Sequence, residues 1–476
     1  MRRNRTFAGA AALWAALALV PGGAAAQGAS ASPPAEGPAA APADTAEPGD
    51  TAARHVEELE QRVRILERRL ELDHEAAAAA KASASTLTAG PEGVQFRSAD
   101  GAYAVSFRGY VHSDGRFFVQ GAAKSASTLE LRRVRPILEG TVARHYGFRL
   151  MADFGEGKVL VQDAYLDARL FPFLRVRTGK FKPPIGLERL QSATALAFVE
   201  RALPTALVPN RDVGVQLWGD VGGGAVSYAA GVFNGVADGA SGDLDADGRK
   251  EVAGRVFAQP FRNRPSGFLR GWGFGVAASH GSERGSAAAP GLASYKSPGQ
   301  QTFFAWRANG QAAGTAIAGG AHDRISPQAF FYRGPLGVLA EHVTSRQQVR
   351  RDTSAARLTS RAWQVAAGYV LTGEDASFAG VRPRQAFDPS KHAPGAIELT
   401  ARLSALEADP HAFPLFADPA RSARAAREWA VGANWYLNRN VKVTLDYGRT
   451  RFRGGAADGG DRQAEEGILT RLQLAF

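Results

Sequence analysis

Residues 147–154 read GFRLMADF, and their side chains alternate between two kinds of surface. Phe148, Leu150, Ala152 and Phe154 share one face of an extended chain, and Arg149, Met151 and Asp153 share the other. Because successive side chains of a strand point to opposite faces, this pattern predicts a β-strand with one apolar and one polar face. The segments 163–170 and 441–448 repeat it. Such strands fit a sheet that separates an apolar phase from an aqueous one.

Short alternating segments of this kind, split by Gly, Asp, Asn and Pro, continue over residues 94–476. A soluble β-sandwich would alternate in the same way, but here the polar face is densely charged and no second domain type interrupts the strands. The last strand-like segment ends on an aromatic residue, Phe476, as outer-membrane barrels do. At about 24 residues for each strand with its loop, the segment holds about 16 strands, which leaves an aqueous lumen. The sequence therefore predicts an all-β fold, a 16-stranded antiparallel transmembrane β-barrel.

Three different segments precede the predicted barrel. Residues 1–26 combine early arginines, an apolar stretch of about 14 residues and a small-residue cleavage site, which is typical of a signal peptide rather than of a membrane span of about 20 residues. Residues 27–52 are rich in Ala, Pro, Gly and acidic residues and are predicted to be a disordered linker. Residues 53–80 are predicted to form a coiled-coil helix, with an a/d seam of Val56, Leu59, Val63, Leu66 and Leu70.

The composition narrows the classes of function. The 57 Lys and Arg residues against 46 Asp and Glu residues give a net charge of +11, which fits nucleic acid, an anionic surface or anionic solutes. The secretory leader argues against nucleic acid. We find no catalytic motif, predict no enzyme activity and no cofactor, and predict no metal site. The acidic run at 243–247 lacks the glutamate that closes an EF-hand loop, since position 254 is glycine.

Several blocks resemble a known family, the phosphate- and polyphosphate-selective outer-membrane porins. They are RGYVHSDGRFF (108–118), LRRVRPILEG (131–140), GKFKPPIGLER (179–189), FVERALPTALVPNRDVGVQLWGD (198–220), GVFNG (231–235), YVLTGE (369–374), GAIELTARL (395–403) and NWYLNRNVKVTLDYG (434–448). The resemblance implies a passive diffusion channel, usually a trimer, whose loops fold inward to narrow the pore.

Arginines line the lumen in that family. The resemblance carries an anion-binding, pore-lining role over to Arg108, Arg132, Arg133, Arg189 and Arg201, the last on a long third loop that folds inward. The match departs from the phosphate-selective pattern at three positions: Gln162 stands where an acid is expected, and Arg135 and Lys182 replace aromatic residues. A more basic constriction is therefore expected.

Arg132 and Arg133 are adjacent, so they cannot both point inward from a regular strand. Either a β-bulge turns one of them, or one lies above the membrane. Arginine suits an anion channel because it stays charged and its planar fork matches two phosphate oxygens. Aromatic residues are expected at the two membrane interfaces: Tyr110, Phe117, Phe118, Trp218, Tyr228, Trp272, Trp363, Tyr369, Trp429, Trp435 and Tyr436.

The leading functional hypothesis is an outer-membrane porin of a Gram-negative bacterium that is selective for anions, with phosphate or polyphosphate as the permeant. Its expected partners are small anions, outer-membrane lipid and lipopolysaccharide, and two further copies of the chain, with the N-terminal segment in the periplasm. The basic segment 346–361 is expected to form an extracellular loop and its strand ends. Two alternatives remain: a general or oligosaccharide-type porin with incidental charge, and a structural outer-membrane anchor that uses the coiled coil.

Overall fold

The structure is a computed structural model that describes residues 48–120, 126–264 and 267–476. The predicted signal peptide and most of the predicted linker lie outside the described residues. A helix, α1 (Pro48–Ser83), covers the segment predicted as helical and begins five residues earlier than 53. Among the described residues, no helix is both long and apolar enough to cross a bilayer.

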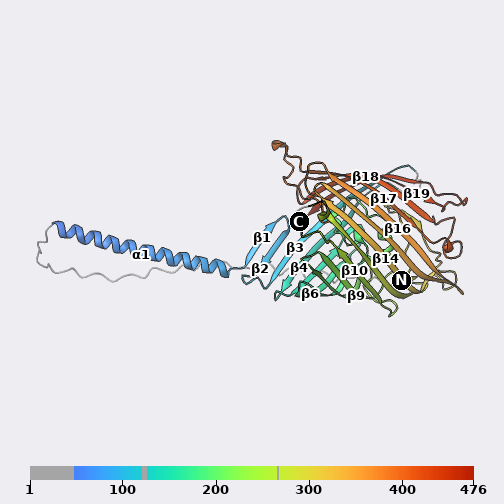
Figure 1. Ribbon diagram of the computed structural model, residues 1–476, viewed down its shortest axis with the longest axis horizontal. Coiled ribbons are helices and arrows are strands. Elements are labelled where there is room, and N and C mark those ends of the chain that lie inside the picture. Colours follow the sequence, from blue (N-terminus) through green and yellow to red (C-terminus); the bar gives the residue numbers. More distant parts are fainter. Residues whose placement is uncertain (1–47, 121–125, 265–266) are drawn as a thin grey trace, which may run out of the picture. The chain divides into compact units, whose positions relative to one another are not determined.

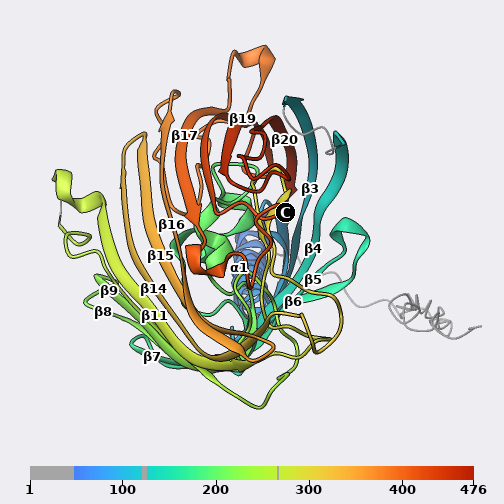
Figure 2. The same ribbon diagram turned by 90° about the vertical axis from the view of Figure 1, so that its right-hand side faces the viewer.

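The second compact unit begins at Ala78 and is a closed barrel (Figures 1 and 2). Sixteen antiparallel strands form the ring in chain order, and the last pairs with the first, β20 with β3. The strands are β3 (Ala104–Gln120), β4 (Thr128–Val142), β5 (Tyr146–Asp153), β6 (Leu160–Phe171), β7 (Leu174–Phe181), β8 (Asp212–Val221), β9 (Val226–Phe233), β10 (Glu251–Ala258), β11 (Trp272–Arg284), β14 (Ile317–Arg333), β15 (Leu336–Arg351), β16 (Ser354–Val370), β17 (Ala396–Glu407), β18 (Ala425–Tyr436), β19 (Val441–Arg453) and β20 (Glu465–Ala475). This confirms the predicted 16-stranded barrel.

A short hairpin extends the sheet beyond the ring. Its strands are β1 (Thr86–Gly90) and β2 (Gly93–Arg97), and β2 pairs with the first residues of β3. The two backbone groups of Phe476 bond to Gly109 of β3, so the C-terminus meets β3 where the pairing with β2 ends. The closed ring thus starts at β3, about ten residues after the predicted boundary at 94.

The two faces of the wall follow the alternation in the sequence. On β5, Leu150 is exposed on the outside, whereas Met151 and Asp153 are buried on the inside. On β20, Leu472 and Leu474 face outward and alternate with the buried Arg471 and Gln473. The apolar residues face outward because lipid surrounds a membrane barrel, and the polar ones line the interior.

The two ends of the barrel differ. Most connections at one end are short turns, as at 143–145, 172–173, 222–225, 334–335 and 437–440, with longer segments at 259–271 and 371–395. The other end carries the long connections, notably 182–211 and 285–316. Segment 182–211, which we call the inner loop, lies inside the ring of strands (Figure 2, green).

A hydrophobic cluster packs under the long loops. Phe303 and Phe304 of β13 (Thr302–Phe304) are fully buried, and the Phe303 ring lies 5.7 Å from that of Phe452 on β19. β13 pairs with β12 (Tyr295–Lys296) inside the 285–316 connection. This cluster fills part of the barrel interior at the long-loop end.

The expectation for aromatic residues was wrong in part. Trp363, Trp429, Trp435 and Tyr369 are exposed on the outer face. Tyr110, Trp218 and Tyr436 instead line the interior, whereas Tyr228 shares the outer face of β9 with the exposed Val232. Alternation alone decides this difference, because an aromatic residue one position along a strand faces the other way.

We predict that an arginine on the outer face in mid-strand destabilises the barrel. Leu445 on β19 is 51% exposed, and a charge at the bilayer midplane costs about 2–4 kcal/mol. Leu445→Arg should lower the free energy of unfolding in lipid vesicles, measured by urea titration, by that amount. Leu244→Arg is the control, because Leu244 is 85% exposed in the connection between β9 and β10. Equal effects of the two changes would contradict a lipid-facing wall.

Candidate functional site: a basic cavity in the barrel

The barrel encloses a cavity of about 1300 Å³. Its lining extends from Asn438 and Arg439 in a turn at the short-turn end to Lys296 and Gln300 in the 285–316 connection. Strands β3 to β10 form one wall, and the inner loop crosses the space between this wall and strands β15 to β20. The inner loop therefore sets the width of the free passage.

The charge of the cavity is strongly positive. Among the described residues that line it, sixteen are Lys or Arg and seven are Asp or Glu. In a narrow space with low-dielectric walls, an excess of one sign attracts ions of the opposite sign. The lining of the cavity is therefore electropositive.

All five arginines singled out from the sequence line this cavity. Arg108 lies on β3 and Arg132 and Arg133 on β4. Arg189 lies in the short helix α2 (Leu187–Leu190) of the inner loop, and Arg201 follows in the same loop.

A β-bulge solves the problem of the two adjacent arginines. His112 of β3 pairs with Arg133, but the next residue of β3, Ser113, pairs with Leu131. Arg132 is therefore the extra residue of β4, and the bulge turns its side chain to the lumen beside that of Arg133. A second bulge on β6 does the same for Gln162, because Met151 pairs with Asp163 and Ala152 with Val161.

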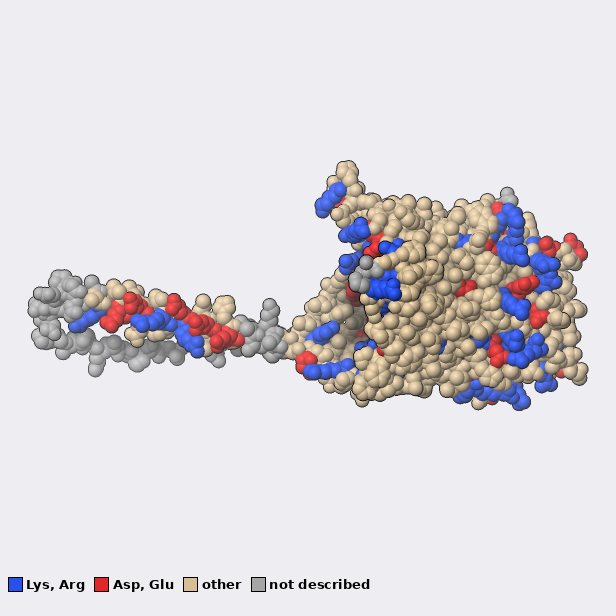
Figure 3. Space-filling model, in the orientation of Figure 1, with Lys and Arg blue, Asp and Glu red and all other residues tan. Residues whose placement is uncertain are grey.

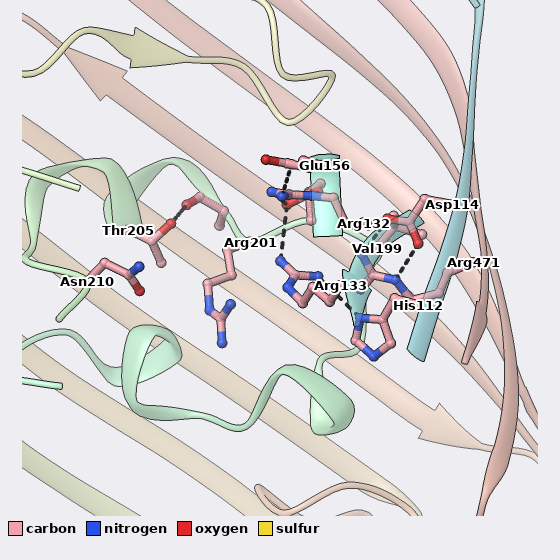
Figure 4. Close-up of polar contacts among 12 residues, drawn as sticks. His112, Asp114, Arg132, Arg133, Glu156, Val199, Arg201, Thr205, Asn210 and Arg471 are labelled. Carbon is pink, nitrogen blue, oxygen red and sulfur yellow. Dashed lines mark hydrogen bonds and ion pairs between the residues drawn. The ribbon is translucent and has the colours of Figure 1, made fainter. Parts of the chain in front are cut away.

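The strand arginines are held by carboxylates. Arg132 donates to Glu200 of the inner loop at 2.6 Å and also to Glu156 (Figure 4). Arg133 lies 3.9 Å from Glu200, and Arg108 lies 2.8 Å from Glu139. These pairs orient guanidinium groups toward the lumen and neutralise part of their charge.

Two cations of the cavity are held by carbonyl groups instead. Arg201 donates to the backbone oxygens of Glu188 at 3.2 Å and Gln191 at 2.8 Å. Lys182 donates to the backbone oxygens of Leu190 at 3.3 Å and Gln191 at 2.9 Å. In Figure 4 the Arg201 side chain extends away from Arg132 and Glu156.

Arg189 is held in the same way, by Asn210 and by the backbone oxygen of Thr205. In the described part of the chain, no carboxylate oxygen lies within 4.0 Å of the cationic nitrogens of Arg189, Arg201 or Lys182. Carbonyl groups orient these side chains, and Arg189 and Arg201 keep a positive charge that no ion pair of the described residues offsets.

Burial and neighbouring charges shift the pKa values of residues in the inner loop. Burial, together with the neighbouring Arg201, Arg211 and Arg189, lowers the pKa of Lys182 well below its usual value. Burial alone would raise the pKa of Glu200, but Arg132 and Arg133 outweigh it, so the pKa of Glu200 lies below its ordinary value. Glu200 is therefore ionised and remains a firm partner for Arg132.

The sequence analysis missed several lining cations, including Arg149, Arg177, Arg211, Arg255 and Lys442. Alternation could have found Arg149 and Arg177, since they lie on the polar faces of their strands. Arg211 ends the inner loop, and its contact with Asp163 at 3.1 Å depends on the fold of that loop. Arg135, noted only as a departure, lines the cavity too and donates to Asp153 at 2.7 Å.

Acidic residues of the wall hold the inner loop. Glu341 of β15 accepts hydrogen bonds from the backbone N–H groups of Leu187, at 2.6 Å, and Glu188. Asp446 of β19 accepts one from Val199 at 2.6 Å. These carboxylates bind backbone amides of the loop, so they anchor it without cancelling its arginines.

A closed barrel with a charged, loop-narrowed lumen defines a porin, a channel of the outer membrane. The chain belongs to the family of phosphate-selective porins O and P, whose model matches residues 105–476. No curated protein matches the sequence. Members of this family and fold are channels, which agrees with the prediction of no enzyme activity. Among the described residues, no group of three or more side chains could hold a metal ion.

One solved channel structure shares the fold. The outer-membrane channel DcaP of Acinetobacter baumannii superposes with a TM-score of 0.52 at 13% identity, covering 82% of this chain and all of that one. OmpT of Vibrio cholerae gives a TM-score of 0.49 at 12% identity, with 79% of this chain and 98% of that chain covered. At 13% identity the likeness to DcaP shows the fold alone.

We predict that releasing the inner loop widens the pore. In Glu341→Ala, the buried N–H groups of Leu187 and Glu188 lose their acceptor, at a cost of about 1–3 kcal/mol, and the loop detaches from β15. Single-channel conductance in planar bilayers should rise, and Asp446→Ala should act in the same direction through Val199. Glu407→Ala is the control, because Glu407 is exposed at the end of β17. Unchanged conductance in both loop variants would refute the anchoring role.

Proposed function

We propose that this porin is a passive, anion-selective diffusion channel with phosphate or polyphosphate as its favoured permeant. The observation that carries the proposal is the excess of Lys and Arg over Asp and Glu in the cavity, above all Arg201 and Arg189, which form no ion pair with a described carboxylate. Arg108, Arg132 and Arg133 add charge along the wall. The family description, phosphate-selective porins, agrees with this proposal.

An anion loses part of its hydration at a constriction. Fixed guanidinium groups replace that hydration with charge-assisted hydrogen bonds. A pair of charges 4 Å apart is worth about 1 kcal/mol in water and about 4 kcal/mol at an effective dielectric constant near 20. Conduction also needs several weak sites rather than one tight one. Cations at several heights in the lumen fit that need.

We further propose that the barrels assemble as trimers and that α1 lies in the periplasm and self-associates. The seam residues Val56, Leu59, Val63 and Leu66 are each at least half exposed in the single chain. Ion pairs such as Arg62–Glu58 at 2.8 Å support the helix along its polar side. An exposed apolar seam fits packing against other copies of the same helix.

Arg201 provides the sharpest test of anion selectivity. Arg201→Ala removes a cation without freeing a carboxylate, so the anion-to-cation permeability ratio should fall about fivefold, which corresponds to about 1 kcal/mol of lost interaction. Reversal potentials under a salt gradient measure this ratio. Phosphate titration of the single-channel chloride current should show weaker block in Arg201→Ala and in Arg133→Ala than in the wild type.

Arg264→Ala serves as the control, since Arg264 is exposed in the 259–271 turn and outside the cavity. A reversal potential showing that the wild-type channel prefers cations would contradict the proposal. A chloride current unaffected by phosphate would favour a general or oligosaccharide-type porin with incidental charge.

Deleting residues 27–83 tests the role of the N-terminal segment. The barrel closes without these residues, so conductance and selectivity should stay at wild-type values. The trimer should dissociate at a lower temperature in gel-shift assays, because the helices no longer hold the subunits together. A trimer of unchanged stability would contradict self-association of α1, and loss of envelope integrity would favour a tethering role.

A further inference from the structure

The outer face of the barrel carries arginines that the lumen does not use. Segment 346–361, expected to form a loop and its strand ends, is the tip of the β15–β16 hairpin, with only two residues in its turn. Together with the ends of β18 and β19 it presents eight outward-facing arginines at the long-loop end, which we call the outer arginine band. They are Arg346, Arg350, Arg357, Arg361, Arg427, Arg449, Arg451 and Arg453.

The strand alternation fixes their direction. On β18 the residues next to Arg427, Ala426 and Glu428, are buried in the interior, whereas Arg427 is exposed. On β19 Thr450 and Phe452 are buried and alternate with Arg449, Arg451 and Arg453. In Figure 3 the middle of the wall carries few charges, and the Lys and Arg side chains lie toward its two ends.

Aromatic residues mark the level at which the band begins. On β16, which runs from the long-loop end to the short-turn end, Trp363 is exposed near the middle of the strand. Arg361 lies two residues closer to the long loops. On β18 and β19, Trp429 and Tyr447 form an edge-on pair with ring centroids 5.6 Å apart, and Arg427 and Arg449 lie two residues beyond them. Tryptophan and tyrosine collect at the membrane–water interface. The arginines just beyond them therefore lie at the level of lipid head groups.

The charge of the band is unbalanced on β18 and β19. Arg427 and Arg451 are direct cross-strand partners, a position in which like charges repel. Arg453 follows on the same face of β19, opposite Ala425. Elsewhere in the band Arg357 pairs with Asp323, Arg449 with Glu466 at 2.8 Å, and Arg361 lies opposite Glu407. In the described part of the chain, the side chains of Arg427, Arg451 and Arg453 have no carboxylate partner.

We propose that Arg427, Arg451 and Arg453 bind a phosphate group of an acylated lipid in the outer leaflet, the class to which lipopolysaccharide belongs. A phosphate between the three guanidinium groups relieves their repulsion and accepts charge-assisted hydrogen bonds from them. The acyl chains of the same molecule lie along the apolar wall on the membrane side of Trp429 and Tyr447, where Val431 and Leu445 are 46% and 51% exposed. A free phosphate ion would interact only with the three arginines. An uncharged lipid would contact only the apolar wall.

The test uses the full-length, detergent-solubilised porin with three probes: diphosphorylated lipid A, the same lipid without its phosphates, and inorganic phosphate. Diphosphorylated lipid A should raise the melting temperature of the wild type, and native mass spectrometry should show the lipid retained on the protein. The other two probes should do neither. In R427A/R451A/R453A, at least half of the shift and most of the retained lipid should be lost.

Two further variants keep the result interpretable. The matched control R262A/R264A/R333A removes three exposed arginines from the short-turn end and should bind as the wild type does. R427K/R451K/R453K preserves the charge and should retain part of the shift, even if the alanine variant folds poorly. Lipid A binding that is equal in the alanine variant and the wild type would overturn the proposal. So would a shift of the same size with dephosphorylated lipid or with inorganic phosphate. Because no readout involves conductance, the outcome is independent of anion selectivity.

Discussion

The structure depends on the closure of β20 onto β3. In a bilayer, every backbone N–H and C=O group must find a partner within the protein, and a ring of strands meets this demand only when no edge is left open. Once the ring closes, alternate side chains have just two destinations, lipid or lumen. The charged residues of the strands therefore turn inward wherever the wall crosses the apolar layer.

This inward crowding of charge would not by itself make a channel. Most strand arginines meet a carboxylate, as Arg135 meets Asp153 and Arg108 meets Glu139. The inner loop changes the balance, because it brings Arg201 and Lys182 into the lumen and holds them by carbonyl oxygens. The acids that hold the loop, Glu341 and Asp446, are occupied by its backbone amides. The fold thus separates the groups that position the loop from the groups that can act on an ion.

The same residue type has different surroundings on the two sides of the wall. Inside, Arg132 lies in a network with Glu156 and Glu200. Outside, Arg427 and Arg451 face each other across two strands, beyond the aromatic residues that mark the interface. A shift of one residue in the alternation separates these two environments. The arginines of this chain therefore have two different roles, depending on whether they face the lumen or the membrane.

The sequence by itself determined the barrel, because the period of two between apolar and polar residues is a local property that survives whatever the loops do. It also placed Arg108 on the inner face and the end of the chain on a lipid-facing strand. It could not decide between the two directions open to Arg132 and Arg133, because a bulge depends on the register with β3, which only pairing reveals. The sequence also could not show that Arg201 lacks a carboxylate partner while other lining arginines have one. It could not show that Tyr110 faces inward and Trp429 outward. Partners such as Glu200 or the carbonyl of Gln191 are distant in the chain, and only the folded inner loop brings them to the cation they hold.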